Sequence, residues 1–174
     1  MLIKTVRGFT PQYGKNCFFT ENATLIGEVF MGDDCSVWYQ AVVRGDVNAI
    51  SIGDRVNIQD GALIHGTFEH SSTTIGNDVS IGHNAIVHGC TINDRVLVGM
   101  GSIIMDDSVI GSNSIIAAGS LLLKNTKVTE GSVYAGVPAK KIKDVSPELQ
   151  KGEIERIARN YMKYASRFLS LIHI

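Results

Sequence analysis

The chain has 174 residues, 44% of them hydrophobic, and its 16 basic and 17 acidic residues leave a formal net charge of -1. This length and apolar share predict one globular unit with a sizeable core. Lysine and arginine do not cluster among aromatic residues, no apolar run is long enough to span a membrane, and the first residues, MLIKTVRGF, lack a signal-peptide pattern, so we expect a cytoplasmic protein without nucleic-acid or membrane partners.

A six-residue repeat runs through most of the chain. Aliphatic residues recur in steps of six, with irregular intervals after residues 43, 64 and 87, and several of them precede a glycine. This period fits neither the 3.6 residues of a helical turn nor the alternation of an ordinary strand. The aliphatic positions are 31, 37, 43, 52, 58, 64, 75, 81, 87, 92, 98, 104, 110, 116 and 122.

We interpret each hexad as a short strand that ends in a tight corner, so that three hexads close a triangular coil of 18 residues. Such coils stack as parallel strands about 4.8 Å apart, and only the stack buries a continuous apolar column. The sequence therefore predicts an all-β solenoid, the hexapeptide-repeat domain, over residues 1–145. The long interval after residue 64, HGTFEHSSTT, is predicted to bulge out as a loop.

Residues 146–169 change to helical spacing. Ser146 suits the N-cap position and Pro147 the first helical position. We predict a helix and tail over 146–174 that pack against the solenoid, and we interpret His173, in the tail, as structural or disordered. The apolar face of the helix contains Leu149, Ile154, Ile157, Tyr161, Ala165 and Phe168.

Three cysteines, Cys17, Cys35 and Cys90, cannot all pair within one chain. Their spacings match no zinc ribbon and no redox CxxC motif, which is typical of a reducing compartment. We interpret all three as buried thiols.

Two histidines fall in one column of the predicted stack. If the hexads that start at 52, 58 and 64 form faces one, two and three of a coil, those at 75, 81 and 87 form the same faces of the next coil. His65 and His88 then stack on face three about 4.8 Å apart, in the column that also contains Arg44. His83 falls on face two, directly above Asp60 of the preceding coil.

These histidines predict a metal site shared between chains, because side chains on two faces of a rigid prism cannot all meet inside one chain. Imidazole is a common zinc ligand. If three prisms pack about a threefold axis, His65 and His88 of one subunit receive His83 from the next. The alternative is that three surface histidines align without binding a metal.

Three segments resemble the γ-class carbonic anhydrases and their bacterial homologues: VVRGDV at 42–47, NIQDGALIH at 57–65 and IGHNAIVHGC at 81–90. The likeness covers nearly the whole chain, including YAGVPAK at 134–140, a segment that many hexapeptide-repeat acyltransferases share. The resemblance implies a left-handed parallel β-helix. A six-residue period does not itself determine the handedness.

The same resemblance implies a homotrimer that binds zinc, or iron or cobalt, at its subunit interfaces through His65, His83 and His88. It also implies that Arg44 and Asp46 hold the interface by ion pairing. The implied reaction is the reversible hydration of CO2 to bicarbonate by a metal-bound hydroxide.

Three further residues, Asn57, Gln59 and Asp60, line the site that this resemblance implies. Gln59 could orient the hydroxide or the bicarbonate. Asp60 could orient a metal ligand by accepting a hydrogen bond from the side of the ligand that faces away from the metal. The alternative for both is plain polar stacking on the outside of a solenoid.

Two departures from the family concern proton transfer. Val47 stands where members of high activity have a glutamate, and the loop after His65 is short, with Glu69 and His70 as its titratable candidates for a proton shuttle. Because proton export can limit turnover, we expect weak hydration activity.

Two other functions compete with this one. A coenzyme A-dependent acyltransferase on the same solenoid needs basic residues for the cofactor's phosphates, and Lys140 and Lys141 are the candidates. It has no need of three histidines in converging columns. A non-catalytic trimeric scaffold would keep the trimer and show no turnover.

Overall fold

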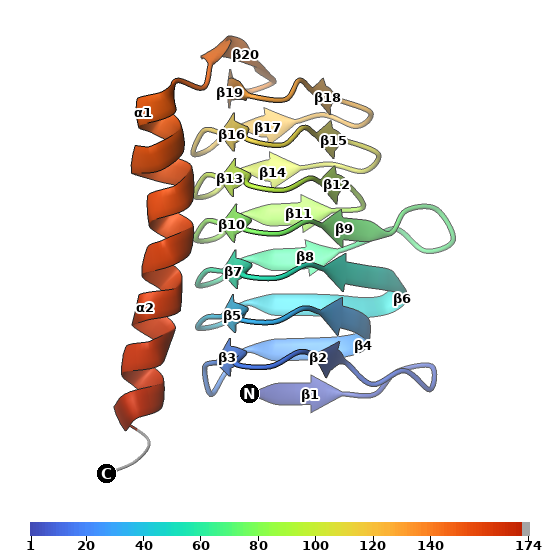
Figure 1. Cartoon of the computed structure of the whole chain (residues 1–174). Helices are drawn as coiled ribbons and strands as arrows, with labels where there is room; N and C mark the ends of the chain where they lie inside the picture. The colour runs from blue at the N-terminus through green and yellow to red at the C-terminus, as the bar shows by residue number, and fades with distance from the viewer. Residues whose placement is uncertain (172–174) are drawn as a thin grey trace.

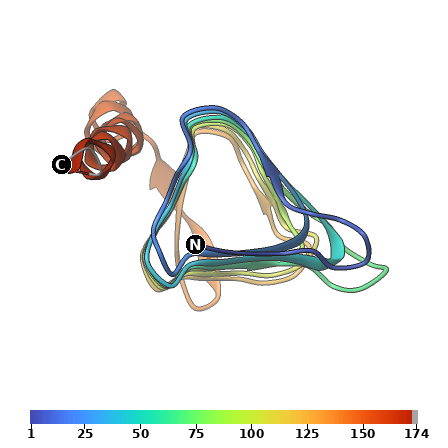
Figure 2. The same cartoon turned by 90° about the horizontal axis from the view of Figure 1, so that it is seen from below.

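The computed structural model describes residues 1–171, so the prediction made for His173 lies outside the described residues. The chain winds into a triangular prism, and one helical segment runs beside it (Figure 1). In Figure 2, seen from the N-terminal end, the coils run counterclockwise as they recede from the viewer, which is a left-handed turn. The predicted left-handed parallel β-helix is confirmed.

Parallel strands stack on three faces of the prism, and two long strands, β4 (Thr24–Met31) and β6 (Val42–Ile52), bend from face three into face one. Face one also contains β2 (Gln12–Tyr13), β9 (Thr73–Ile75), β12 (Thr91–Ile92), β15 (Val109–Ile110) and β18 (Lys127–Val128). Face two contains β3 (Phe18–Phe19), β5 (Ser36–Val37), β7 (Asn57–Ile58), β10 (Ser80–Ile81), β13 (Leu97–Val98), β16 (Ile115–Ile116), β19 (Ser132–Gly136) and β20 (Ala139–Asp144). Face three also contains β1 (Leu2–Lys4), β8 (Leu63–His65), β11 (Ile86–His88), β14 (Ile103–Ile104) and β17 (Leu121–Leu122).

The strand register follows the hexads. Ile52 pairs with Ile75 on face one, and Ile64 pairs with Val87 on face three. Residues 66–72 are therefore left out of the coil and bulge outward between β8 and β9. The loop is shorter than the predicted 65–74, because His65 pairs in β8 and Thr73 and Thr74 pair in β9. All the aliphatic residues of the repeat lie in one buried core, which the stack closes coil by coil.

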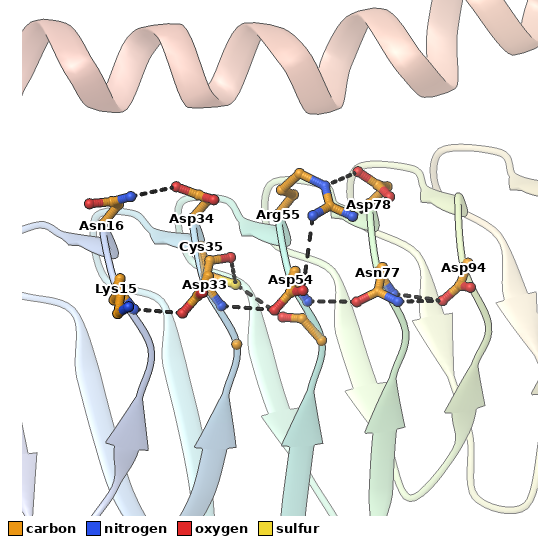
Figure 3. Close-up of polar contacts among 12 residues, drawn as sticks. Lys15, Asn16, Asp33, Asp34, Cys35, Asp54, Arg55, Asn77, Asp78 and Asp94 are labelled. Carbon is orange, nitrogen blue, oxygen red and sulfur yellow. Dashed lines mark hydrogen bonds and ion pairs between the residues drawn. The ribbon is translucent and has the colours of Figure 1, made fainter.

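A ladder of aspartate and asparagine side chains lines the corner between faces one and two (Figure 3). Oδ1 of Asp33 accepts the backbone N–H of Lys15 at 2.7 Å, and Oδ1 of Asp54 accepts that of Asp33 at 2.9 Å. Asn77 and Asp94 continue this corner ladder, each accepting at 2.8 Å from the preceding rung. Each rung thus satisfies a corner N–H that no strand pairs.

The C-terminal segment packs along face two, where Tyr161 and Ala165 contact Phe18 and Trp38. It comprises α1 (Pro147–Leu149), a π-helical turn (Gln150–Glu155) and α2 (Arg156–Leu171). Among the described residues, no helix is long and apolar enough to cross a membrane.

The predicted start of the helix is confirmed, because Ser146 Oγ accepts the N–H of Leu149 at 3.3 Å and Pro147 is the first helical residue. The π-helical turn was not predicted. Leu149 and Ile154 both pack against Ile115 and Val133, and their five-residue spacing matches the wider turn. Phe168, predicted on the apolar face, keeps 38% of its surface exposed.

The prediction of three buried thiols is right for Cys35 and Cys90 and wrong for Cys17, which is only partly buried. Cys17 precedes β3, the edge strand of face two, so no preceding coil covers it.

Candidate metal centre

His65 and His88 lie side by side on face three. Their Cα atoms are register partners in the β8–β11 pair, which confirms the predicted column. Nδ1 of His65 lies 3.3 Å from Nε2 of His88.

A carboxylate occupies the far side of each of these rings. Nε2 of His65 lies 3.0 Å from Oδ1 of Asp46, and Nδ1 of His88 lies 3.0 Å from Oδ1 of Asp106. Because an ionised carboxylate only accepts hydrogen bonds, both of these ring nitrogens carry the proton. In the neutral rings, the two nitrogens that face each other are therefore bare lone pairs.

Both carboxylates, Asp46 and Asp106, are ionised at neutral pH. Burial by itself raises the pKa of Asp46, but hydrogen bonds from Arg44 and His65 outweigh it and hold that pKa below its usual value. Burial also opposes ionisation of Asp106, yet hydrogen bonds from Ser71, Thr67 and His88 hold its pKa well below the usual range. Burial, the largest effect on His65, lowers its pKa and so favours the neutral ring.

This pair of nitrogens fits a cation. Two lone pairs that face each other at 3.3 Å repel and share no proton, and a positive ion between them removes the repulsion. Zn–N bonds of about 2.0–2.1 Å at a tetrahedral angle place two ligand nitrogens about 3.4 Å apart. His65 and His88 therefore already have the separation of two ligands of one tetrahedral ion.

His83 lies in the turn that follows β10, at the corner between faces two and three, and contacts Asp60 of the preceding coil, as the column predicts, with Nδ1 and Oδ2 2.9 Å apart. Its other nitrogen, Nε2, lies 3.3 Å from the hydroxyl of Tyr161 on α2. Burial, with a smaller effect from the charge of Asp60, raises the pKa of Tyr161 to about 12, so this hydroxyl is protonated and donates. Within residues 1–171 of one chain, no three histidine, cysteine or acidic side chains converge on one point.

Asn57 lies on β7 of face two, and Gln59 directly follows that strand. Both are buried, and Nε2 of Gln59 donates to Oδ1 of Asn57 at 3.0 Å, while Asn57 donates to Ser80 at 2.7 Å. Gln59 and His83 border a cavity of about 320 Å³ between face two and α2. Its walls are mostly apolar and include Leu97, Val98, Met100, Ile115, Ala117 and Ile157.

The remaining predicted residues lie near face three. Arg44 forms an ion pair with Asp46 inside one chain, at 2.6 Å. The backbone oxygen of Val47 accepts from the Arg7 guanidinium at 2.6 Å. In the loop, His70 lies 2.9 Å from Asp107, while Glu69 adopts a positive φ of 53°.

Two residues that contact the histidines were missed by sequence reasoning. Asp106 follows His88 by 18 residues, but Ile104 pairs with Val87, so the position opposite His88 is Met105 and the spacing does not indicate the contact. Tyr161 was predicted only as part of an apolar helix face, and nothing in its spacing indicated His83 as its partner.

Comparison with known proteins agrees with this architecture. The family described as bacterial transferase hexapeptide (six repeats) matches residues 89–124. Protein YrdA of Escherichia coli is 40% identical over 174 residues, covering 97% of this chain and 94% of that protein. A hexapeptide transferase family protein from Anaplasma phagocytophilum superposes with a TM-score of 0.91 at 37% identity, over 96% of this chain and 98% of its own. The fold and its repeat thus define a hexapeptide-repeat β-helix protein.

A more specific likeness is to the carbonic anhydrase of Geobacillus kaustophilus. It is 35% identical over 170 residues, which cover 98% of this chain and 92% of that enzyme. Gamma carbonic anhydrase 2, mitochondrial, of Arabidopsis thaliana is 40% identical over 161 residues, which cover 90% of this chain and 58% of that protein. The chain belongs to the γ-carbonic anhydrase family.

Proposed function

We propose that this protein is a metal-dependent, carbonic anhydrase-like enzyme that catalyses the reversible hydration of CO2. The observation that carries the proposal is the pair of bare nitrogens of His65 and His88, 3.3 Å apart, each ring held from behind by a carboxylate. Membership of the γ-carbonic anhydrase family supports it. Zinc suits three imidazoles best, with iron or cobalt as the other candidates.

The proposed enzyme is a homotrimer, because the third ligand has to come from another chain. His83 has the same carboxylate support as the other two histidines, but it lies in the turn after β10 and not on face three. A neighbouring subunit can bring its His83 to the His65–His88 pair if face two of one prism opposes face three of the next. The contact with Tyr161, at 3.3 Å, then has to be released, which costs roughly 1 kcal/mol.

The residues around the histidines have separate roles in this proposal. A divalent metal supplies the Lewis acidity that makes water a nucleophile at neutral pH. Asp46 and Asp60 hold His65 and His83 in the tautomers that leave a nitrogen bare. Asn57 fixes the carboxamide of Gln59 beside the cavity, where it is placed to orient the substrate or the bicarbonate.

The structure favours this function over an acyltransferase. Lys140 and Lys141, the candidates for binding coenzyme A phosphates, lie on β20. Three strands, β19, β16 and β13, separate β20 from β10, the strand that precedes His83. The lysines and the histidines therefore do not form one site on face two.

The decisive experiment is metal analysis of the purified protein together with a CO2 hydration assay. We expect one zinc, iron or cobalt ion per subunit, hydration that a chelator abolishes, and recovery when metal is returned. His88→Ala should lose the metal, whereas the control His70→Ala should keep it. Failure of the reconstituted wild type to bind any metal would reject the proposal, and a metal-loaded trimer without turnover would support the scaffold instead.

A further inference from the structure

We propose that Asp106 is the positioning residue of this site: it fixes His88 as a metal ligand and anchors the loop of residues 66–72 to that ligand. The inference rests on the proposed metal site. Asp106 is acidic yet only 5% exposed, and no sequence motif marks it.

One oxygen of Asp106 gathers three donors. Oδ1 accepts from Nδ1 of His88 at 3.0 Å, from Oγ of Ser71 at 2.6 Å and from Oγ1 of Thr67 at 2.8 Å. The second oxygen lies 3.7 Å from the ammonium group of Lys124. This number of donors is what an ionised carboxylate needs when water is largely excluded.

The backbone next to His88 leaves room for this carboxylate. Gly89 has a φ of +52°, and a Cβ atom at this position would overlap both the Asp106 carboxylate and the Ser71 hydroxyl. The glycine that follows the histidine therefore admits the carboxylate to the ring.

The contact decides which nitrogen of His88 can bind a metal. The hydrogen bond to Asp106 keeps the proton on Nδ1, so Nε2 stays bare and points at Nδ1 of His65. Without the carboxylate, the ring can place its proton on Nε2 or turn away, and both changes remove the ligand.

The same oxygen holds the loop at both of its ends. Thr67 and Ser71 form an isolated bridge, and Asn48 donates to the backbone oxygens of both. Because both hydroxyls end on Asp106, the loop that carries His70 and the ring of His88 share one anchor. A change at Asp106 should therefore alter metal binding and loop order together.

The test compares Asp106→Ala and Asp106→Asn with the control Asp107→Asn, which removes a neighbouring carboxylate that binds His70 instead of a predicted ligand. Zinc affinity is measured by competition with a colorimetric chelator. We expect Asp106→Ala to bind zinc about 10- to 100-fold more weakly, Asp106→Asn to lose less because it keeps an acceptor oxygen, and Asp107→Asn to match the wild type.

Two further readouts use the metal-free protein. Nitrogen-15 NMR of His88 should show the proton on Nδ1 in the wild type and in Asp107→Asn, and a mixture of tautomers in the Asp106 variants. Hydrogen exchange of residues 66–72 should accelerate in the Asp106 variants alone. If Asp106→Ala does not fold, Asp106→Asn carries all three measurements.

The outcomes separate the two proposals. A wild type that binds no zinc rejects the metal enzyme, whereas the tautomer and exchange measurements still decide the role of Asp106. A wild type that binds zinc, with unchanged affinity and unchanged tautomer in the Asp106 variants, overturns the inference about Asp106.

Discussion

Asp60 and His83 lie in neighbouring coils, and their side chains meet with Oδ2 2.9 Å from Nδ1. A carboxylate from another coil likewise supports His65 and His88, so all three predicted ligands share one arrangement. Such carboxylates fix the tautomer of a metal-binding histidine and raise its basicity. In this fold the stacking of coils brings each acid to its histidine.

The sharing of the site between chains can be tested by mixing variants. Pure His83→Ala and pure His88→Ala trimers should each bind no metal. When they are unfolded and refolded together in equal amounts, an interface is complete wherever a His83→Ala chain supplies His65 and His88 and its neighbour supplies His83. Random assembly gives that arrangement at about a quarter of interfaces, so zinc content should recover to roughly a quarter of the wild-type value. No recovery in trimers shown by mass spectrometry to be mixed would place all ligands within one chain.

Hydration should be slow and should depend on buffer. Val47 offers no carboxylate, and the loop offers only Glu69 and His70 to carry protons outward. Stopped-flow assays at fixed pH should therefore show turnover that rises with the concentration of a small imidazole buffer. A fast rate that does not change with buffer concentration would mean that the missing carboxylates are not needed.

Tyr161→Phe should tighten zinc binding. The hydroxyl of Tyr161 competes for the lone pair on Nε2 of His83, and a net hydrogen bond of 0.5–1.5 kcal/mol corresponds to a gain of roughly 2- to 10-fold in affinity. Tyr164→Phe, on the same helix, serves as the control because its ring packs against Tyr161. Weaker binding by Tyr161→Phe would show that the hydroxyl supports the site.

Cys17 should be the most reactive thiol. A hydrogen bond from Cys35 lowers the pKa of Cys17 to about 7, whereas burial raises that of Cys90 to about 12. The thiolate is the reactive form and predominates above the pKa, so alkylation of Cys17 by iodoacetamide should rise through pH 7. Cys35→Ala removes the donor and should shift this rise to higher pH. An unchanged profile in Cys35→Ala would assign the low pKa to another cause.

The corner ladder should contribute measurably to stability. Asp54→Ala leaves the N–H of Asp33 without its acceptor and should lower the free energy of unfolding by about 1 kcal/mol. Asp54→Asn keeps the acceptor oxygen and should lose much less. Urea denaturation of both variants makes the comparison, and equal losses would attribute the effect to the charge of Asp54.

The stacking of His65 on His88 could be predicted because the hexad fixes each residue's face and position, and the loop of residues 66–72 absorbs the irregular interval. The contact between Asp106 and His88 could not be predicted from the sequence. Ile104 pairs with Val87, so the next residue, Met105, lies opposite His88. Asp106 is one position further along, and its carboxylate extends to His88 from there. The hexad repeat predicts which residues are register partners, but not contacts between side chains that are one position out of register.

The place where the helix lies was equally beyond sequence reasoning. An apolar face predicts that α2 packs on the prism, but it does not determine which coil meets Tyr161. That depends on how Phe18 and Trp38 fit the helix. The π-helical turn likewise depends on tertiary packing, because Leu149 and Ile154 join one cluster with Ile115 and Val133.

The last strand of face two runs against all the others. β20 pairs antiparallel with β19 and forms the outer edge of that sheet, with Lys140, Lys141 and Lys143 exposed. A stack of parallel coils offers each end as a template on which another copy could continue the stack. Reversed direction and three positive charges oppose such growth. The hairpin thus protects a repetitive fold from fibre formation at its C-terminal end.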